Sequence, residues 1–218
     1  MQDCLSGQKY ILVFGASVVD MFGFCNSSYK ACDSIPGKIK ISFGGVSRNI
    51  AENMARVGVK TGKTNFILDP ISSTKAEKVK HLIKYFHTIK PNRVEAEVLS
   101  GIKINTREDL EKVGKHFLSL GIKNVFISLD ADGIYYTNGT ESGTLKATGV
   151  TVKNVTGAGD SFVAGLGFGY MNDLSIKDTV KFSMAMSIVT ISHEETIHPK
   201  MGHELIQEII EKTNWIEN

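Results

Sequence analysis

The chain has 218 residues, and its 25 lysines and arginines nearly balance its 23 aspartates and glutamates. A net charge of +2 gives no reason to expect nucleic acid or a membrane surface as a partner. The length suits one large α/β domain, so we expect residues 1–218 to form a single domain.

Three cysteines without metal-type spacing favour a reducing compartment. The first residues lack a basic segment followed by an apolar run, and no apolar stretch is long enough to span a bilayer. We therefore expect a cytoplasmic protein without a secretory signal.

The first half of the chain alternates short apolar runs with helical patterns. The apolar runs predict strands at 10–14, 38–42 and 65–68. Apolar residues at helical spacing predict helices at 46–57, where Gly58 is a natural stop, and at 73–86.

The second half continues this alternation. We expect strands at 88–90 and 124–129, a helix at 106–120 and an antiparallel hairpin from 134–139 and 144–147. Two long helices follow Gly157, and a last helix covers 205–212. Strands alternating with helices predict an α/β fold whose mainly parallel sheet has helices on both faces.

The most informative segment is a glycine-rich turn that leads into an apolar helix. Gly157 and Gly159 flank Ala158, and Asp160 follows in the first helical turn. Backbone N–H groups at a helix start form an anion site, which glycines let a ligand approach closely. Asp160 could accept a proton from a hydroxyl that attacks such an anion, as phosphoryl transfer requires. The alternative is a plain turn with an acid at a helix start.

Four motifs in order resemble the ribokinase-like (PfkB) carbohydrate kinases: residues 15–20, 44–51, 92–95 and 155–160. Within that family, 37–51 is most similar to the pseudouridine kinases. The resemblance covers nearly the whole chain. It implies a three-layer sandwich and an enzyme that uses ATP and Mg²⁺, with a monovalent cation as a further candidate cofactor.

The resemblance assigns roles to single residues. Asp160 would be the catalytic base, and the backbone of Gly157, Ala158 and Gly159 would hold the transferring phosphoryl group. The sugar would contact four residues, namely Asp20, which should lie just past a strand end, Gly44, Gly45 and Asn49. The structural alternatives are a loop acid, a turn and a polar residue on the wet face of a helix.

The nucleotide and metal roles are implied in the same way. Ser128, Gly133, Asn154 and Thr156 would lie on the ATP side. Asn92 and Glu95 would hold magnesium through water, although Glu three residues after Asn also fits a helix capping box. Asp130 stands where the family often has a small residue, and an acid close to ATP phosphates is unfavourable unless it turns away.

The chain departs from the family in its middle. Residues 58–64 join the double-glycine helix directly to the next strand, where the family has several further strands and part of a lid. We expect the lid and part of the N-terminal half to be reduced, with 37–43 as a residual lid-type strand. An unpaired sheet edge should make the chain self-associate or lose stability.

Three other patterns are rejected as sites. Gly62-Lys63-Thr64 mimics the end of a P-loop, but Val57 stands where its first glycine belongs and a strand follows. His193 and His198 lack HExxH spacing. The glycines at 165, 167 and 169 lie inside a helix and are expected to permit close packing of that helix against the sheet.

Two hypotheses from different classes remain. The first is an ATP-dependent kinase of a small nucleoside or sugar, foremost of the 5′-hydroxyl of pseudouridine, with another substrate of the same family as the alternative. The second is a non-catalytic nucleotide-binding remnant that the shortening has left behind.

Overall fold

A computed structural model describes residues 18–25, 37–44, 46–58 and 66–218. Its strands are β1 (Val18–Cys25), β2 (Gly37–Gly44), β3 (Ile67–Leu68), β4 (Thr88–Ile89), β5 (Asn124–Ser128), β6 (Ile134–Thr137), β7 (Ser142–Thr148) and β8 (Asn214–Glu217). Its α-helices are α1 (Val46–Arg56), α2 (Ser73–Val79), α3 (Arg93–Ser100), α4 (Arg107–Ser119), α5 (Ala158–Met171), α6 (Ile176–Ile191) and α7 (His203–Lys212). Two 3₁₀ segments, η1 (Lys80–Tyr85) and η2 (Asp130–Asp132), complete the described elements.

The main sheet is six-stranded, in the order β3-β4-β5-β6-β7-β8. The strands β3, β4 and β5 run parallel, whereas β6, β7 and β8 add antiparallel partners. The predicted hairpin is confirmed as β6 and β7. The expected α/β architecture is therefore present, with a parallel part that ends at β5.

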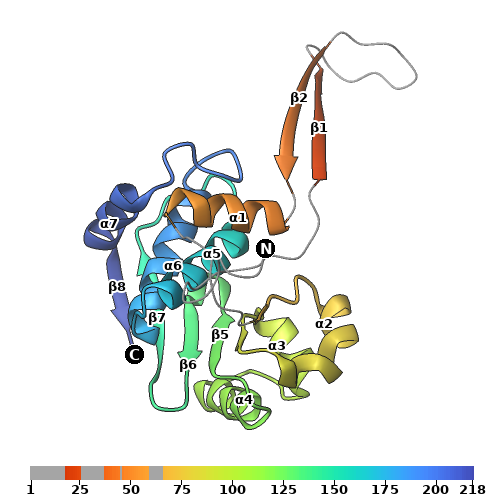
Figure 1. Cartoon of the computed structure of the whole chain (residues 1–218), viewed down its shortest axis with the longest axis vertical. Coiled ribbons are helices and arrows are strands. Elements are labelled where there is room, and N and C mark those ends of the chain that lie inside the picture. Colours follow the sequence, from red (N-terminus) through yellow and green to blue (C-terminus); the bar gives the residue numbers. More distant parts are fainter. Residues whose placement is uncertain (1–17, 26–36, 45, 59–65) are drawn as a thin grey trace, which may run out of the picture.

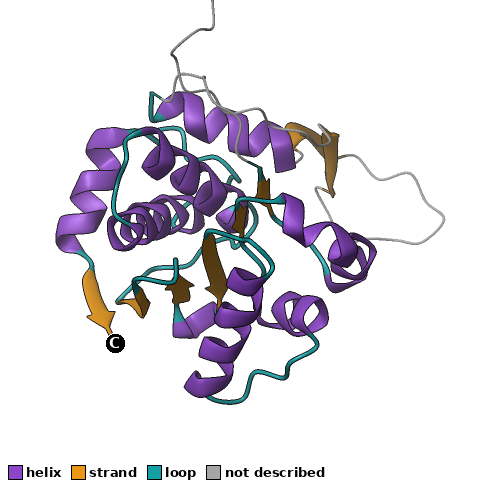
Figure 2. Cartoon of the chain, turned by 60° about the horizontal axis from the view of Figure 1, so that its bottom comes forward, coloured by secondary structure: helices purple, strands orange, loops and turns teal. Residues whose placement is uncertain are grey.

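Helices cover both faces of this sheet (Figures 1 and 2). Alternate residues of β5 show why: Val125 and Ile127 are buried with α2, α3 and α4, while Phe126 is buried with α5 and α6. Side chains of a strand alternate between faces, so one strand supplies both cores. The result is a three-layer arrangement.

The strands β1 and β2 form a separate antiparallel ribbon that stands out from the rest of the chain (Figure 1). The predicted strand at 38–42 is part of β2. Asp20 lies within β1, opposite Ser42, and not in a loop past a strand end. The strand expected at 10–14 lies outside the described residues.

The remaining differences from the sequence expectations are local. The helix expected at 73–86 ends as α-helix at Val79 and continues as η1. The strand β8 follows the last helix and was not expected. Close packing of the glycine-rich helix was predicted correctly, but its partner is another helix: a Cβ at Gly165 would lie 2.5 Å from Cα of Ser183 in α6.

Candidate active site

The first turn of α5 begins at a glycine that the backbone requires. Gly157 is the N-cap of α5 and has φ +83°, in the left-handed region. A Cβ there would also lie 2.9 Å from the carbonyl oxygen of Thr196. The helix begins at Ala158, so Asp160 lies in its first turn, where the N–H groups have no acceptor within the helix. Ala158 N–H, which was expected to hold the phosphoryl group, donates instead to Val155 O at 3.3 Å. The first-turn N–H groups of Gly159 and Asp160 remain as candidate donors.

A side chain from α1 meets the candidate base. Asn49 is buried, and its Nδ2 donates a hydrogen bond of 2.9 Å to Oδ2 of Asp160. Its Oδ1 is buried without a hydrogen-bond partner among the described residues. An unsatisfied buried acceptor is costly and calls for an explanation, such as a ligand group that donates to it. The predicted sugar residue and the predicted base are therefore in direct contact.

A second polar link holds the same two helices together. Asn53, one turn after Asn49, donates through Nδ2 to Oγ of Ser161 at 3.1 Å. Ser161 is in turn hydrogen bonded to Thr190 of α6 at 2.5 Å. These side chains are fully buried, so the network fixes α1 against α5 and α6. Sequence reasoning missed Asn53, whose only signal was a polar residue four places after Asn49 on the buried face.

The surroundings of Asp160 alter its acidity. Burial raises the pKa of Asp160 above its ordinary value, and the hydrogen bond from Asn49 opposes that rise. The carboxylate of Asp69 raises this pKa further, whereas the ammonium of Lys90 lowers it. A raised pKa is typical of a group that must pick up a proton near neutral pH.

Two charged residues at the carboxyl ends of adjacent parallel strands complete the surroundings. Asp69 follows β3 and Lys90 follows β4, and Nζ of Lys90 lies 3.3 Å from Oδ2 of Asp69. Open α/β sheets place ligand groups at this edge. Sequence reasoning assigned neither residue a role, although a charged residue directly after a buried strand was the available signal.

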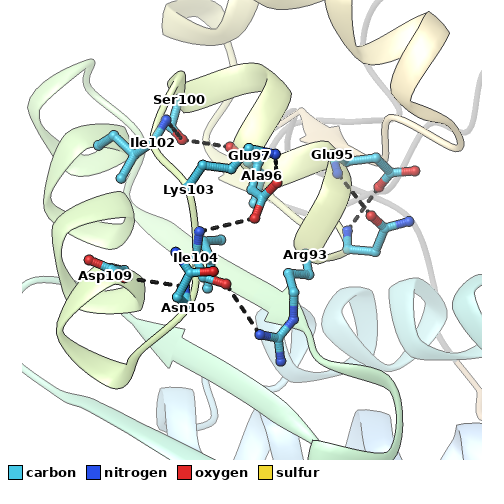
Figure 3. Close-up of polar contacts among 11 residues, drawn as sticks. Arg93, Glu95, Ala96, Glu97, Ser100, Ile102, Lys103, Ile104, Asn105 and Asp109 are labelled. Carbon is cyan, nitrogen blue, oxygen red and sulfur yellow. Dashed lines mark hydrogen bonds and ion pairs between the residues drawn. The ribbon is translucent and has the colours of Figure 1, made fainter.

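Asn92 and Glu95 form the capping box of α3. Backbone N–H of Asn92 donates to Oε2 of Glu95 at 2.8 Å, and N–H of Glu95 donates to Oδ1 of Asn92 at 2.9 Å. Figure 3 shows Glu95 at this crossing, on the helix that also carries Arg93. The structural alternative for the pair is thus confirmed, and the metal role stays a prediction. Burial is the main cause of a raised pKa for Glu95, which is 2% exposed.

The residues expected on the ATP side are Ser128, which ends β5, Gly133 in the loop after it, and Asn154 and Thr156 before α5. Ser128 N–H donates to Pro91 O at 3.0 Å, and Gly133, at φ +88°, packs against the backbone of Leu145. Asn154 Oδ1 accepts from Thr156 N–H at 2.9 Å, and its Nδ2 donates to Glu194 O at 2.8 Å. These contacts shape the loops, and nucleotide binding by the four residues stays a prediction.

Asp130 occupies the first position of η2 with φ +52° and is exposed. The next acid in that loop, Asp132, pairs with Arg93 at 3.7 Å and with Lys146 at 3.5 Å. The loop is therefore held to α3 and β7.

Two of the expected sugar residues, Gly44 and Asp20, fall in the ribbon. Gly44 ends β2, Gly45 lies outside the described residues, and Asp20 is in β1. The structure describes no side chain in β1, so the sugar role of Asp20 stays a prediction.

Of the rejected patterns, the histidine pair and the helix glycines lie in the described part of the chain. The residues at 62–64 lie outside it. His193 and His198 stack edge to face at 4.8 Å, and no group of three or more metal-type side chains occurs in the part described.

A cavity of about 340 Å³ lies at the amino ends of β4 and β5, beside Thr88 and Asn124, and so at the opposite edge of the sheet from Asp160. No described helix is long and apolar enough to cross a membrane.

Comparison with known proteins identifies the family. The profile of the pfkB family carbohydrate kinases matches residues 60–201. The chain belongs to this family. Its members are phosphotransferases that act on sugar hydroxyl groups.

Three relatives illustrate the similarity. The pseudouridine kinase of Escherichia coli is 26% identical over 304 positions, covering 94% of this chain and 97% of that protein. A candidate sugar kinase of known structure from Clostridium perfringens is 44% identical, with a TM-score of 0.92 and coverage of 97% and 98%. The ribokinase of Arabidopsis thaliana, solved with ribose and ATP, shares only the fold: 13% identity and a TM-score of 0.67, with coverage of 90% and 96%.

The alignment with the pseudouridine kinase is longer than the chain itself. It extends over 304 positions, whereas the chain has 218 residues. Many positions must therefore lie opposite gaps in this chain. This agrees with the internal shortening that the short 58–64 connection indicated.

Proposed function

We propose that the protein is an ATP-dependent kinase that phosphorylates the 5′-hydroxyl of a ribosyl compound, foremost pseudouridine. The observation that carries the proposal is the pair formed by Asp160 and Asn49. A half-buried carboxylate in the first turn of α5 is hydrogen bonded to a buried amide whose Oδ1 has no partner among the described residues. We further propose that the chain works as a single cytoplasmic domain.

In this proposal Asp160 takes the proton as the O–H bond of the substrate hydroxyl breaks. The hydroxyl oxygen forms a bond to the γ-phosphorus, and the bond to the β–γ bridging oxygen breaks, so that its electrons leave with ADP. The N–H groups of Gly159 and Asp160 hold the charge on the transferring group. Asn49 orients the base, and its Oδ1 accepts a hydrogen bond from a substrate hydroxyl.

Magnesium would neutralise part of the ATP phosphate charge. In the described structure the cap engages Oε2 of Glu95 and not Oε1, and Asp69 lies close enough to raise the pKa of Glu95. Carboxylate oxygens suit magnesium, but the deep burial of Glu95 favours a metal held through water. Asn92 would act by fixing Glu95. A monovalent cation belongs to the proposal as a second, activating ion.

Pseudouridine is the first choice of substrate because a relative that aligns with 94% of this chain is a pseudouridine kinase and the double-glycine segment is similar to that group. Other sugars or nucleosides phosphorylated within the family are the alternative. The gaps in the alignment favour a second candidate function, a nucleotide-binding remnant that no longer transfers phosphate.

A single assay distinguishes these proposals. ADP release is measured with ATP and magnesium, alone and with pseudouridine, uridine, ribose or fructose 6-phosphate. ADP release that depends on pseudouridine, with the phosphate found on the 5′ oxygen, supports the first proposal. Greater activity on a hexose phosphate would overturn the nucleoside assignment, whereas the assignment to the family would stand. Nucleotide binding without release for any acceptor would support the remnant.

A further inference from the structure

A buried lysine lies next to the proposed anion site. Lys90 is 7% exposed, and lysine is seldom buried unless it is paired. Among the described residues its ion-pair partner is Asp69, at 3.3 Å. This pair links the ends of β3 and β4. It lies at the carboxyl edge of the sheet, where open α/β sheets bind ligands.

The ammonium group is directed at the first turn of α5. A Cβ built on Gly159 would lie 3.6 Å from Nζ of Lys90. Gly159 has no side chain, so nothing at that position separates the ammonium from the helix N–H groups. The unsatisfied Oδ1 of Asn49 is an acceptor, so it suits the hydroxyl that attacks the phosphoryl group and leaves the phosphate oxygens to the donors of Lys90 and the helix.

We propose that Lys90 binds an oxygen of the γ-phosphoryl group and that Asp69 positions its ammonium for this contact. The inference rests on the proposed kinase function of the site. An ammonium has three donors, and the pair with Asp69 needs one of them. The others can meet a phosphate oxygen beside Gly159, where a charge-assisted bond in a buried site is strong. The bond gains strength as negative charge moves onto the oxygens of the transferring group.

The competing explanation is that Lys90 only balances the charge of nearby acids. Asp69, Glu95 and Asp160 all lie close enough for their charges to interact, and Lys90 lowers the pKa of the last two. The two explanations differ in one measurable respect. A residue that contacts the γ-phosphate distinguishes a nucleoside triphosphate from a diphosphate, whereas a residue that balances acids does not.

The test is calorimetric titration with magnesium AMP-PNP, which resists transfer, and with magnesium ADP. Lys90→Met removes the ammonium and keeps much of the side-chain length. The double variant Asp69→Asn with Lys90→Met removes both charges, which avoids an uncompensated buried carboxylate and preserves folding if the single variant unfolds. Lys78→Met, on the exposed surface of α2, is the matched control for loss of a lysine.

We expect both Lys90 variants to bind AMP-PNP at least about tenfold more weakly, while ADP affinity stays within about threefold of wild type. Lys78→Met should change neither affinity. Equal weakening for the two nucleotides, or no weakening, in a folded Lys90 variant would overturn the inference and leave the kinase proposal intact. A wild-type protein that binds neither nucleotide would overturn the kinase proposal, and this inference with it.

Discussion

The amide of Asn49 and the carboxylate of Asp160 are joined by a 2.9 Å hydrogen bond between residues 111 positions apart in the sequence. One side chain thus orients the candidate base through Nδ2 and keeps Oδ1 for another donor. The site is built where α1 crosses the start of α5, so its geometry depends on how these two helices pack.

Asp160→Asn should abolish most of the activity. The amide keeps the shape and can still accept the bond from Asn49, but it cannot take a proton. We expect turnover to fall by about a hundredfold or more, with ATP affinity nearly unchanged. Steady-state kinetics and nucleotide titration measure both quantities. Turnover within a few-fold of wild type would exclude Asp160 as the base.

The same variant should not lose stability at neutral pH. Burial raises the pKa of Asp160, so the folded state binds this proton more tightly than the unfolded state does. Stability from this group therefore falls as pH rises through the raised pKa, and an uncharged residue avoids that loss. A melting temperature equal to or above that of wild type at pH 7 is expected, whereas a clear drop would point to a structural role.

Asn49→Ala should move the acidic limb of the pH–rate profile to higher pH. Asn49 opposes the rise that burial and Asp69 cause in the pKa of Asp160, and Lys90 is then the remaining group that lowers it. With a still higher pKa, the base is ionised only at higher pH. The pH dependence of kcat measures this. Asn53→Ala is the control, because Asn53 bonds Ser161 and not Asp160; a shared shift in both variants would contradict the prediction.

Variants of Asn92 should separate capping from metal binding. Asn92→Ala removes the side-chain acceptor for Glu95 N–H and should cost about 1 kcal/mol of stability. Asn92→Ser keeps a capping oxygen and should restore the melting temperature. If the residue also supports magnesium by fixing Glu95, the magnesium concentration for half-maximal activity should stay raised in the serine variant. If the serine variant recovers both the melting temperature and the magnesium dependence of wild type, Asn92 acts only as a helix cap.

Gly165→Ala tests the contact between α5 and α6. In a helix, alanine is more favourable than glycine by about 1 kcal/mol, so the substitution would raise stability if the methyl group had room. Here the new methyl group would lie 2.5 Å from the backbone of Ser183. Overpacking of this kind costs about 1–3 kcal/mol, so a net loss is expected. Denaturant unfolding measures it, and an unchanged or higher stability would show that the helices can separate at low cost.

The shortened middle should affect association. Of the described strands, β3 forms one edge of the main sheet, and Phe66 and Ile71 beside it are about half exposed. Exposed apolar side chains at a sheet edge favour pairing with another chain. We expect self-association or a low melting temperature, measured by light scattering and thermal unfolding. A stable monomer with tight nucleoside binding would show that the missing strands are not needed.

Much of the fold could be predicted because local patterns decide it. A short apolar run indicated β5, and the glycines before Asp160 indicated the start of α5. The capping box at Asn92 was also readable, since it needs only three-residue spacing. Features that depend on distant partners were not predictable in this way. The strand β8 exists because β7 offers it an edge, and the pair of Asp69 with Lys90 exists because β3 and β4 lie side by side.

The strand that contains Asp20 was not predictable for a similar reason. From the sequence it follows a predicted strand at 10–14, whereas the structure pairs it with Ser42 inside the ribbon. Pairing across a ribbon depends on register between two separate segments, which neither segment specifies alone.

The glycine contacts between α5 and α6 determine which parts of the site can move. At Gly165 and Gly169 the two helices meet without space for a methyl group, so Asp160 sits on a helix that cannot slide or rotate past its neighbour. The helix α1 is held to the same pair, because Ile50 and Met54 share a buried core with α5 and α6 and Asn49 and Asn53 bond to α5. The base and the amide that orients it therefore belong to one packed unit, so their mutual geometry is set before a substrate arrives.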